Sequence, residues 1–365
     1  MEPQSPQVQN TPSQNINTQY PAPHPAPQHN KPLFLILIAL VIVVGALGYV
    51  TFFSEPKITG LEVAIKTTSF LDKTLQSDGS MTAGFVCDMA TDQCNPIVLN
   101  PNQPDLSQAI YGYYELAKVM DNQSYRAKSD QAIDFVLDKC RTNFHMCDRN
   151  VSPIASYYLD TKDKKYLDAT YSSAKKLLVL SNQDLVSQDV GPNLAILYRA
   201  TGDDRYKKRL IDVANEELLS WPRGRDRLEY SLRVVWSVFI PAYTVTNDQK
   251  YLIASENFFD NFNLAENFDL SLVTPESIIK GVEALLSLSK MSDHGSVYKA
   301  KAHAALQEVL NQFWDNPENP KLNGDYGFGY ASGTSNKYFK IALYNGWLIK
   351  LFAVMADEKF NLPTK

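Results

Sequence analysis

A short polar turn followed by a tyrosine recurs five times in the chain. The tyrosines lie 41, 40, 45 and 47 residues apart, at Tyr125, Tyr166, Tyr206, Tyr251 and Tyr298. After the turn that begins at Thr201, apolar residues follow a helical period, at Tyr206, Leu210, Val213, Ala214 and Leu218. Repeats of this length are typical of stacked helical hairpins, and we predict that each tyrosine packs where one helix turns into the next.

The segments before these turns also carry helical patterns. We predict helices at 106–120, 151–160, 191–201, 228–246 and 276–291, each joined by a short turn to the amphipathic helix that follows it. A first helix at 58–76 and a last one at 342–356 bring the prediction to twelve helices in six hairpins.

The connections alternate between short and long. Those before the tyrosines are tight, whereas the others cover 77–104, 141–150, 182–190, 220–227, 264–275 and 315–341. In an antiparallel array all the long loops lie on one face, and loops of that length are usually functional. The helices before the short turns are the more apolar, which favours a buried inner ring and a solvated outer ring. We therefore predict an all-α fold, a closed (α/α)6 toroid; an open superhelix is the alternative.

Two phrases resemble known toroids. The turn TGDDRY, followed by its amphipathic helix, resembles the hairpin corner of the six-hairpin glycosidases, and LYNGWLIKLF, which begins at Leu343, resembles their last inner helix. The resemblance covers most of residues 58–365. It extends to unsaturated glucuronyl hydrolases, mannan-degrading hydrolases, sugar epimerases and polysaccharide lyases without selecting one family. It implies a site at the long-loop end, where the inner helices start.

The N-terminal part has a different composition. Residues 1–32 are rich in Pro, Gln and Asn, and we predict a disordered tail. From Leu33 to Phe53 the chain has 21 residues without a charge, enough at ~1.5 Å per residue to span ~30 Å of hydrocarbon. We predict a single transmembrane helix there, with a cleaved signal peptide as the alternative. The toroid domain would then occupy residues 58–365.

Four cysteines follow the apolar segment, in two pairs with six residues between the members: Cys87 with Cys94, and Cys140 with Cys147. An even number favours disulfides, within each loop or between the loops, and an oxidising compartment. We therefore expect a single-pass membrane protein with a cytoplasmic N-terminus and an extracytoplasmic toroid. The spacing is poor for zinc, and we expect no metal and no cofactor. The net charge of −5 and the scattered basic residues argue against nucleic acid.

Glycoside hydrolysis needs two carboxylates, one to protonate the leaving oxygen and one to activate water. The catalytic candidates on the long-loop face are Asp78, Asp189, Asp226 and Glu229. Each has a structural alternative: a turn residue for Asp78, a helix cap for Asp189 or Asp226, and an ion pair with Arg233 for Glu229.

The binding candidates are a cation and aromatic rings that can stack on sugars. They are Arg225, Tyr111, Tyr326, Tyr330 and Trp347. The resulting hypothesis is a membrane-anchored glycoside hydrolase, with a polysaccharide lyase or a sugar epimerase left open. A non-catalytic glycan-binding or scaffold toroid is the main alternative, and a protein-binding solenoid is the third.

Overall fold

The computed structural model describes residues 57–88, 91, 93–97, 106–141, 150–221, 228–267, 274–315, 327–331 and 337–362. The chain divides into two compact units, Met1–Ser54 and Glu55–Lys365, and every described residue lies in the second. The predicted tail and the predicted transmembrane segment from Leu33 to Phe53 lie outside the described residues and stay predictions. Among the helices that the structure describes, none is both long enough and apolar enough to cross a bilayer.

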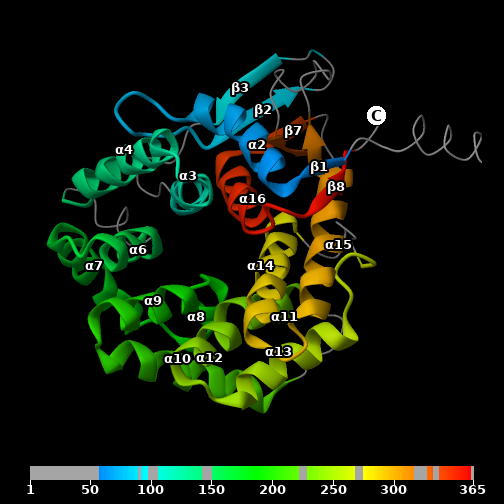
Figure 1. The fold of residues 1–365 in the computed structure, drawn as a ribbon. Coiled ribbons are helices and arrows are strands. Elements are labelled where there is room, and N and C mark those ends of the chain that lie inside the picture. Colours follow the sequence, from blue (N-terminus) through cyan, green and yellow to red (C-terminus); the bar gives the residue numbers. More distant parts are fainter. Residues whose placement is uncertain are drawn as a thin grey trace, which may run out of the picture. The chain divides into compact units, whose positions relative to one another are not determined.

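The helices form two concentric rings (Figure 1). The inner ring consists of α3 (Ser107–Met120), α6 (Val151–Thr161), α9 (Gly191–Thr201), the segmented helix α11–η2–α12 (Leu228–Val234, Val235–Phe239, Ile240–Thr246), α14 (Pro275–Met291) and α16 (Ala342–Val354). Each inner helix contacts the next, and α16 contacts α3, so the ring is closed. The predicted toroid is therefore confirmed, and the open superhelix is wrong.

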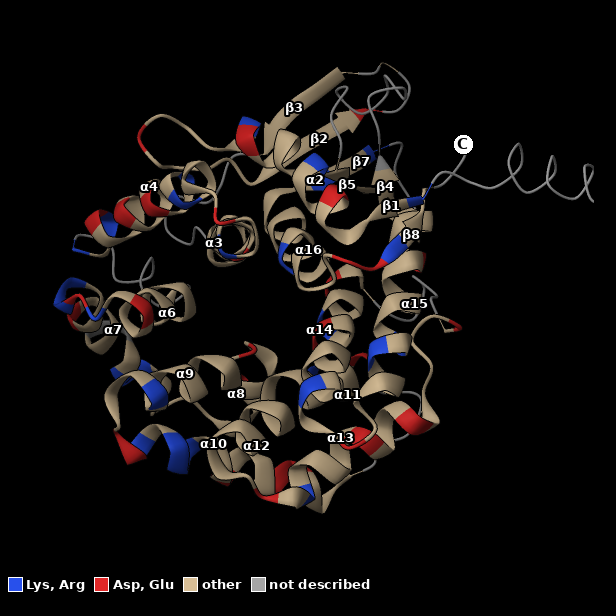
Figure 2. Cartoon of the chain, viewed as in Figure 1, with Lys and Arg blue, Asp and Glu red and all other residues tan. Residues whose placement is uncertain are grey.

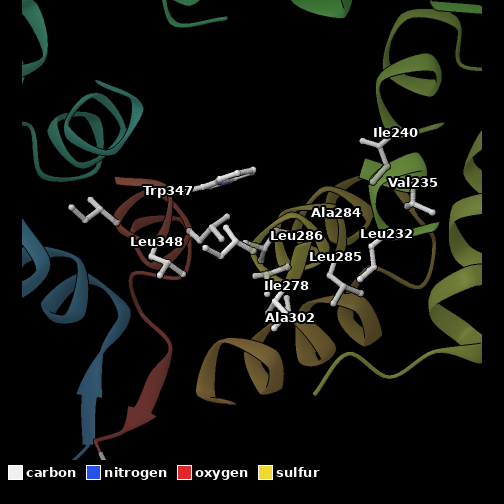
Figure 3. Packing of buried hydrophobic residues seen from close by; sticks show 14 of the residues in the cluster. Leu232, Val235, Ile240, Ile278, Ala284, Leu285, Leu286, Ala302, Trp347 and Leu348 are labelled. Atoms are coloured by element: carbon white, nitrogen blue, oxygen red, sulfur yellow. The ribbon is translucent and has the colours of Figure 1, made fainter. Parts of the chain in front are cut away.

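The outer ring covers the inner one. It consists of α2 (Gly60–Thr74), α4 (Gln123–Cys140), α7 (Lys164–Leu177), α10 (Asp204–Leu219), α13 (Gln249–Asn261) and α15 (Gly295–Phe313). Outer helices α4, α7 and α10 carry many of the charged residues (Figure 2), whereas buried apolar side chains of α14 lie between those of α16 and those of α11 (Figure 3). This division follows from burial, because an inner helix has protein on more sides than an outer one.

The repeated turn is built the same way at three corners. An inner helix ends at a residue with left-handed backbone, and the following aspartate caps the outer helix by accepting a hydrogen bond from the backbone two residues on: Lys162 then Asp163, Gly202 then Asp203, and Asn247 then Asp248. Tyr166, Tyr206, Tyr251 and Tyr298 are buried, and Tyr125 is half-buried. The predicted packing role of the tyrosines is confirmed.

The inner helix predicted at 228–246 is not continuous. A π-helical segment, η2, interrupts it, and the Ile240 N–H bonds to the Val235 carbonyl. Pro241 has no N–H with which to form the usual bond to the Ser237 carbonyl, so the regular ladder cannot continue there. Such wide turns are frequent at functional sites, and this one carries Trp236.

The prediction of an all-α fold misses a small sheet on the long-loop side. Strands β2 (Gly84–Asp88), β3 (Gln93–Ile97), β6 (Tyr330–Ala331) and β7 (Lys337–Ile341) form an antiparallel sheet in the order β3-β2-β7-β6. Two short pairs accompany it: β1 (Lys57–Thr59) with β8 (Lys359–Asn361), and β4 (Trp314–Asp315) with β5 (Gly327–Phe328). The first helix therefore starts at Gly60, after β1, rather than at Ile58. The sheet pairs loops that lie far apart in sequence, which local periodicity does not reveal.

The first cysteine pair forms a disulfide within its own loop. Cys87 on β2 and Cys94 on β3 are bonded and lie directly opposite each other in the antiparallel register. This confirms the predicted pairing and decides for a bond within the loop. Cys140 is also disulfide-bonded, and Cys147 lies outside the described residues.

Candidate active site

A cavity of about 810 Å³ lies among the inner helices. Its lining comes mainly from α3, α6, α9, η2, α14 and α16, together with the segment that leads into α9. It includes residues at the starts of inner helices, such as Ser107, Ser152 and Glu276, as the resemblance implies. Its size is that of a typical small-molecule site.

Asp189 enters this cavity in an unusual backbone conformation. It lies between α8 (Asn182–Ser187) and α9, and its φ of 57° is in the left-handed region that non-glycine residues rarely adopt. Its Oδ1 is buried and, among the described residues, has no hydrogen-bond partner. Burial raises the pKa of the Asp189 carboxyl, although the nearby cations Lys280 and Arg233 oppose that effect. A strained, buried acid with a raised pKa is a frequent feature of active sites.

Lys280 joins Asp189 to a second carboxylate. Its side chain is 1% exposed, and Nζ donates to Asp189 Oδ2 and, at 2.6 Å, to Glu276 Oε1. Because both acceptors bond the same ammonium group, the two carboxylates lie within two hydrogen-bond lengths, about 6 Å. This upper limit is compatible with the spacing of the paired carboxyl groups in retaining glycosidases, roughly 5–5.5 Å.

A second cluster surrounds Glu283 of α14. Its Oε2 accepts hydrogen bonds from the indole Nε1 of Trp236, at 3.0 Å, and of Trp347, at 2.6 Å. The two rings are 5.3 Å apart at an angle of 50°. Lys350 donates to Oε1 of the same carboxylate. Glu283 of α14 therefore holds Trp236 of η2 and Trp347 of α16 in one arrangement.

The side of the cavity formed by α3, α6 and α9 presents hydroxyl and amide groups near Tyr111, together with the charged side chains of Glu115 and Arg199. The Tyr111 hydroxyl and Ser156 Oγ are 2.7 Å apart, and Ser152 donates to Asn193 Oδ1. Burial raises the pKa of Tyr111, so this phenol stays protonated. Hydroxyl and amide groups of this kind suit the hydroxyls of a sugar.

The predicted catalytic residues separate in the structure. Asp189 lines the cavity. The N-cap residue of α9 is Val190, not Asp189, so the capping alternative for Asp189 is wrong. Asp78 is exposed and outside the lining; its Oδ1 accepts hydrogen bonds from the backbone and hydroxyl of Ser80, which confirms the turn alternative. These two bonds also lower the pKa of Asp78.

Glu229 is likewise outside the lining. It is 3.8 Å from Arg233 and accepts hydrogen bonds from Thr274 and Ser277, so it links α11 to the start of α14. The structural alternative for Glu229 is what the structure shows. Asp226 and Arg225 lie outside the described residues, and their roles stay predictions.

The predicted binding residues also differ in position. Tyr111 and Trp347 line the cavity, although Trp347 is only 2% exposed and mainly supports Trp236. Tyr330 does not line it; its ring stacks on Phe339 of the sheet at 5.6 Å. Tyr326 lies outside the described residues.

Four lining residues that matter here escaped the sequence analysis. Glu276, Lys280 and Glu283 recur at intervals of four and three along an otherwise apolar inner helix. Charges on one face of a buried helix are the signal that could have revealed them. Gln108 carries no comparable signal. Within the described residues no group of His, Cys, Asp and Glu side chains could hold a metal ion.

Comparison with solved structures supports the fold. An unsaturated glucuronyl hydrolase of Streptococcus agalactiae, an Asp-to-Asn variant bound to an unsaturated disaccharide, has a TM-score of 0.59 at 12% identity and covers 81% of this chain and 90% of its own. An unsaturated glucuronyl hydrolase of a Bacillus species has a TM-score of 0.58 at 11% sequence identity, and the match covers 80% of this chain and 93% of the hydrolase. An inactive α-1,6-mannanase of a Salegentibacter species, in complex with α-1,6-mannotriose, has a TM-score of 0.57 at 10% sequence identity. The match covers 82% of this chain and 100% of the mannanase.

The chain therefore has the (α/α)6 toroid fold of the six-hairpin glycosidases. Neither a protein-family model nor a curated protein sequence matches it. At these identities the likeness concerns the fold alone, because one fold hosts many functions.

Proposed function

We propose that this protein hydrolyses a glycosidic bond in the central cavity, with Asp189 and Glu276 as the catalytic carboxyls. The observation that carries the proposal is Asp189 itself: a buried carboxyl with left-handed backbone, a raised pKa and a second carboxylate held beside it by Lys280. The fold neighbours include glycoside hydrolases, which supports the choice of reaction.

Asp189 supplies the proton in this scheme, because its raised pKa keeps it protonated at higher pH than an ordinary aspartate. The glycosidic oxygen takes that proton and leaves. Glu276, which is 35% exposed, acts on the anomeric carbon directly or through a water from which it accepts a proton. The anomeric configuration of the first product decides between these two routes. Lys280 fixes both carboxyls and is a positioning residue.

The cellular setting is part of the proposal. The uncharged segment from Leu33 to Phe53 supports a single membrane anchor, and the disulfide between Cys87 and Cys94 supports an oxidising, extracytoplasmic compartment for the toroid. The substrate would then be a glycan outside the cytoplasm.

The test compares three variants on a panel of glycans. Asp189→Asn and Glu276→Gln should each lower kcat/KM by at least about 10²-fold, the size expected for loss of a general acid or its partner. Asp78→Asn is the matched control, since that aspartate lies outside the cavity, and it should keep full activity. Circular dichroism of each variant establishes that the fold is intact. Full activity of folded Asp189→Asn would show that the proposal is wrong.

A non-catalytic glycan-binding toroid is the second candidate. The observation that favours it is that Asp189, Glu276 and Glu283 each bond a lysine, which stabilises the charged form of a carboxyl. It predicts that the wild-type protein binds a glycan and releases no product from it, a result that end-group analysis after prolonged incubation would detect.

A further inference from the structure

The charges that line the cavity balance. Four are acidic and four are basic: Glu115, Asp189, Glu276 and Glu283 against Lys176, Arg199, Lys280 and Lys350. Two of the lysines are already bonded to protein carboxylates: the buried Lys280 to two of them and the half-buried Lys350 to Glu283. Beside this cluster, Arg233 lies 3.8 Å from Asp189, so two acids and two cations meet there.

This arrangement does not suit an anionic sugar. Recognition of a carboxylate ligand normally uses a cation whose donors are directed at the ligand, often an arginine with two parallel hydrogen bonds. Lys280 and Lys350 direct donors at Glu276 and Glu283 instead. Arg199 lines the cavity but is exposed to solvent, where its attraction for an anion is screened. A uronate beside Asp189 and Glu276 would face two carboxyl groups, and the ammonium group of Lys280 already bonds both of them.

The cavity instead offers hydrogen-bond acceptors. Gln108 Oε1 and Asp189 Oδ1 are buried and, among the described residues, have no hydrogen-bond partner. Arg233 Nε is 3.8 Å from Asp189 Oδ1, beyond hydrogen-bond distance. Both residues line the cavity, Gln108 from α3 and Asp189 from the segment before α9. Buried acceptors are normally satisfied, and the hydroxyls of a sugar are donors that can do so.

An apolar platform lies in the same lining. Trp236 is half-buried in the π-helical segment, and its indole N–H is held by Glu283, so its orientation is fixed before a ligand arrives. The face of a pyranose ring stacks on such a side chain. An uncharged sugar fits a site with these features: acceptors for its hydroxyls, a tryptophan ring with a fixed orientation, and lysines, Lys280 and Lys350, that are already paired with protein carboxylates.

We infer that the cavity binds a neutral, hydroxyl-rich glycan, with a sugar hydroxyl donating to Gln108 Oε1, and that it discriminates against the corresponding uronic acid. The inference rests on the proposed function for the location of the site. The fold neighbours do not decide this choice, since some are named for glucuronyl substrates and others for α-1,6-mannan.

The test measures binding, not turnover. Isothermal titration of the wild-type protein uses matched pairs of trisaccharides that differ at C6, with CH₂OH in one and a carboxylate in the other, in the gluco, manno and galacto series. The expected result is at least tenfold tighter binding of the neutral member in the series that binds, with a difference that shrinks as salt screens the repulsion. Tighter or equal binding of the uronate, or no binding by any neutral member, overturns the inference.

Variants separate the two parts of the recognition. Gln108→Ala should weaken binding of the neutral sugar about fivefold to tenfold, whereas Gln312→Ala, at an exposed position on outer helix α15, should leave it unchanged. Glu276→Gln removes one of the two acids around Lys280 and should improve the relative affinity for the uronate. An unchanged preference in Glu276→Gln would contradict the electrostatic reason for the discrimination.

The outcome is distinguishable from failure of the proposed hydrolysis. Neutral binding without any product would remove the catalytic proposal and leave this inference standing. Hydrolysis of a uronate would support the catalytic proposal and remove this inference.

Discussion

At the scale of single residues, the three consecutive residues Asn345, Gly346 and Trp347 make three different kinds of contact. Asn345 accepts a hydrogen bond from the Phe328 backbone N–H and donates to the Phe328 carbonyl, at 2.8 and 2.9 Å, which holds the last loop on α16. Gly346 allows α3 to approach, and Trp347 donates to Glu283 in the cavity wall. The motif therefore joins loop, ring and site within one helical turn.

Asp189 and Arg233 make a prediction about pH. Arg233 lowers the pKa of Asp189, although burial raises it more. If Asp189 is the proton donor, activity is present below its pKa and is lost as pH rises through it. Arg233→Gln removes a cation, so it should raise that pKa and move the alkaline limb of kcat/KM to higher pH. The limb is measured from pH profiles of the wild-type and variant enzymes.

Arg205→Gln is the matched control for this shift. Arg205 is on outer helix α10, is 72% exposed and pairs with Asp203, far from the cavity lining. Its profile should match that of the wild type. A limb that moves to lower pH in Arg233→Gln would assign the ionisation to another group.

At the scale of elements, the repeated corner keeps one backbone conformation, whereas the side chain at its left-handed position varies. The last inner-helix position before the aspartate cap is left-handed whether it is Lys162, Gly202 or Asn247, with φ of 58°, 71° and 57°. Glycine adopts this conformation without steric cost, whereas lysine does not. The corners therefore share geometry but differ in strain.

This difference predicts the outcome of a reciprocal exchange. Lys162→Gly should stabilise the protein by about 0.5–1 kcal/mol, because it relieves the left-handed strain at the end of α6. Gly202→Lys should destabilise it by a similar amount; no atom lies within 4 Å of the added Cβ, so crowding contributes nothing. Denaturant unfolding of both variants gives the two changes. Changes of the same sign would show that the backbone conformation is not their cause.

The π-helical segment η2 and the start of α9 approach each other at backbone distance. A Cβ added at Gly191 would lie 1.5 Å from the Ser237 carbonyl oxygen. Gly191 directly follows Asp189 and Val190, so this contact fixes the segment that carries the candidate acid. The wide turn and the strained aspartate are thus parts of one local arrangement.

At the scale of the whole molecule, the ring closes at α3 and α16, the first and last inner helices. Gly112 and Gly346 meet there, and a Cβ at Gly346 would lie 2.4 Å from the Ala109 Cα. Pairing of β1 with β8 joins the same two ends of the domain outside the inner ring. The cavity depends on this closure, because Gln108 and Tyr111 are on α3 and Trp347 and Lys350 are on α16.

Gly346→Ala should therefore affect stability and the site together. The added methyl group collides with the backbone of α3, so we expect a loss of at least about 2 kcal/mol in the free energy of unfolding, as for overpacked cores. Val354→Ala, at an exposed position on α16, should change it by less than about 0.5 kcal/mol. Thermal unfolding and the tryptophan emission of both variants test this. An unchanged melting temperature in Gly346→Ala would mean that α3 and α16 can separate without cost.

The sequence by itself determined the helices of the two rings and their order. The tyrosine turns, the helical periods and the alternation of loop lengths predict twelve helices in a toroid, because these signals are local and each hairpin repeats them. The even number of cysteines predicts disulfides, but the structure decided that Cys87 pairs with Cys94, because β2 and β3 place the two residues opposite each other.

The tertiary structure alone decided which charged residues meet. Asp189 and Lys280 are 91 residues apart, and Trp347 and Glu283 are 64 apart. Their contacts arise only when the ring closes and inner helices from different hairpins face one centre. Glu229, at the start of α11, and Asp78, in the turn after α2, have the same residue types as the cavity acids, yet they face a neighbouring helix or solvent. Periodicity fixes which face of a helix is buried, but the neighbour that this face meets depends on the closed arrangement of all six hairpins.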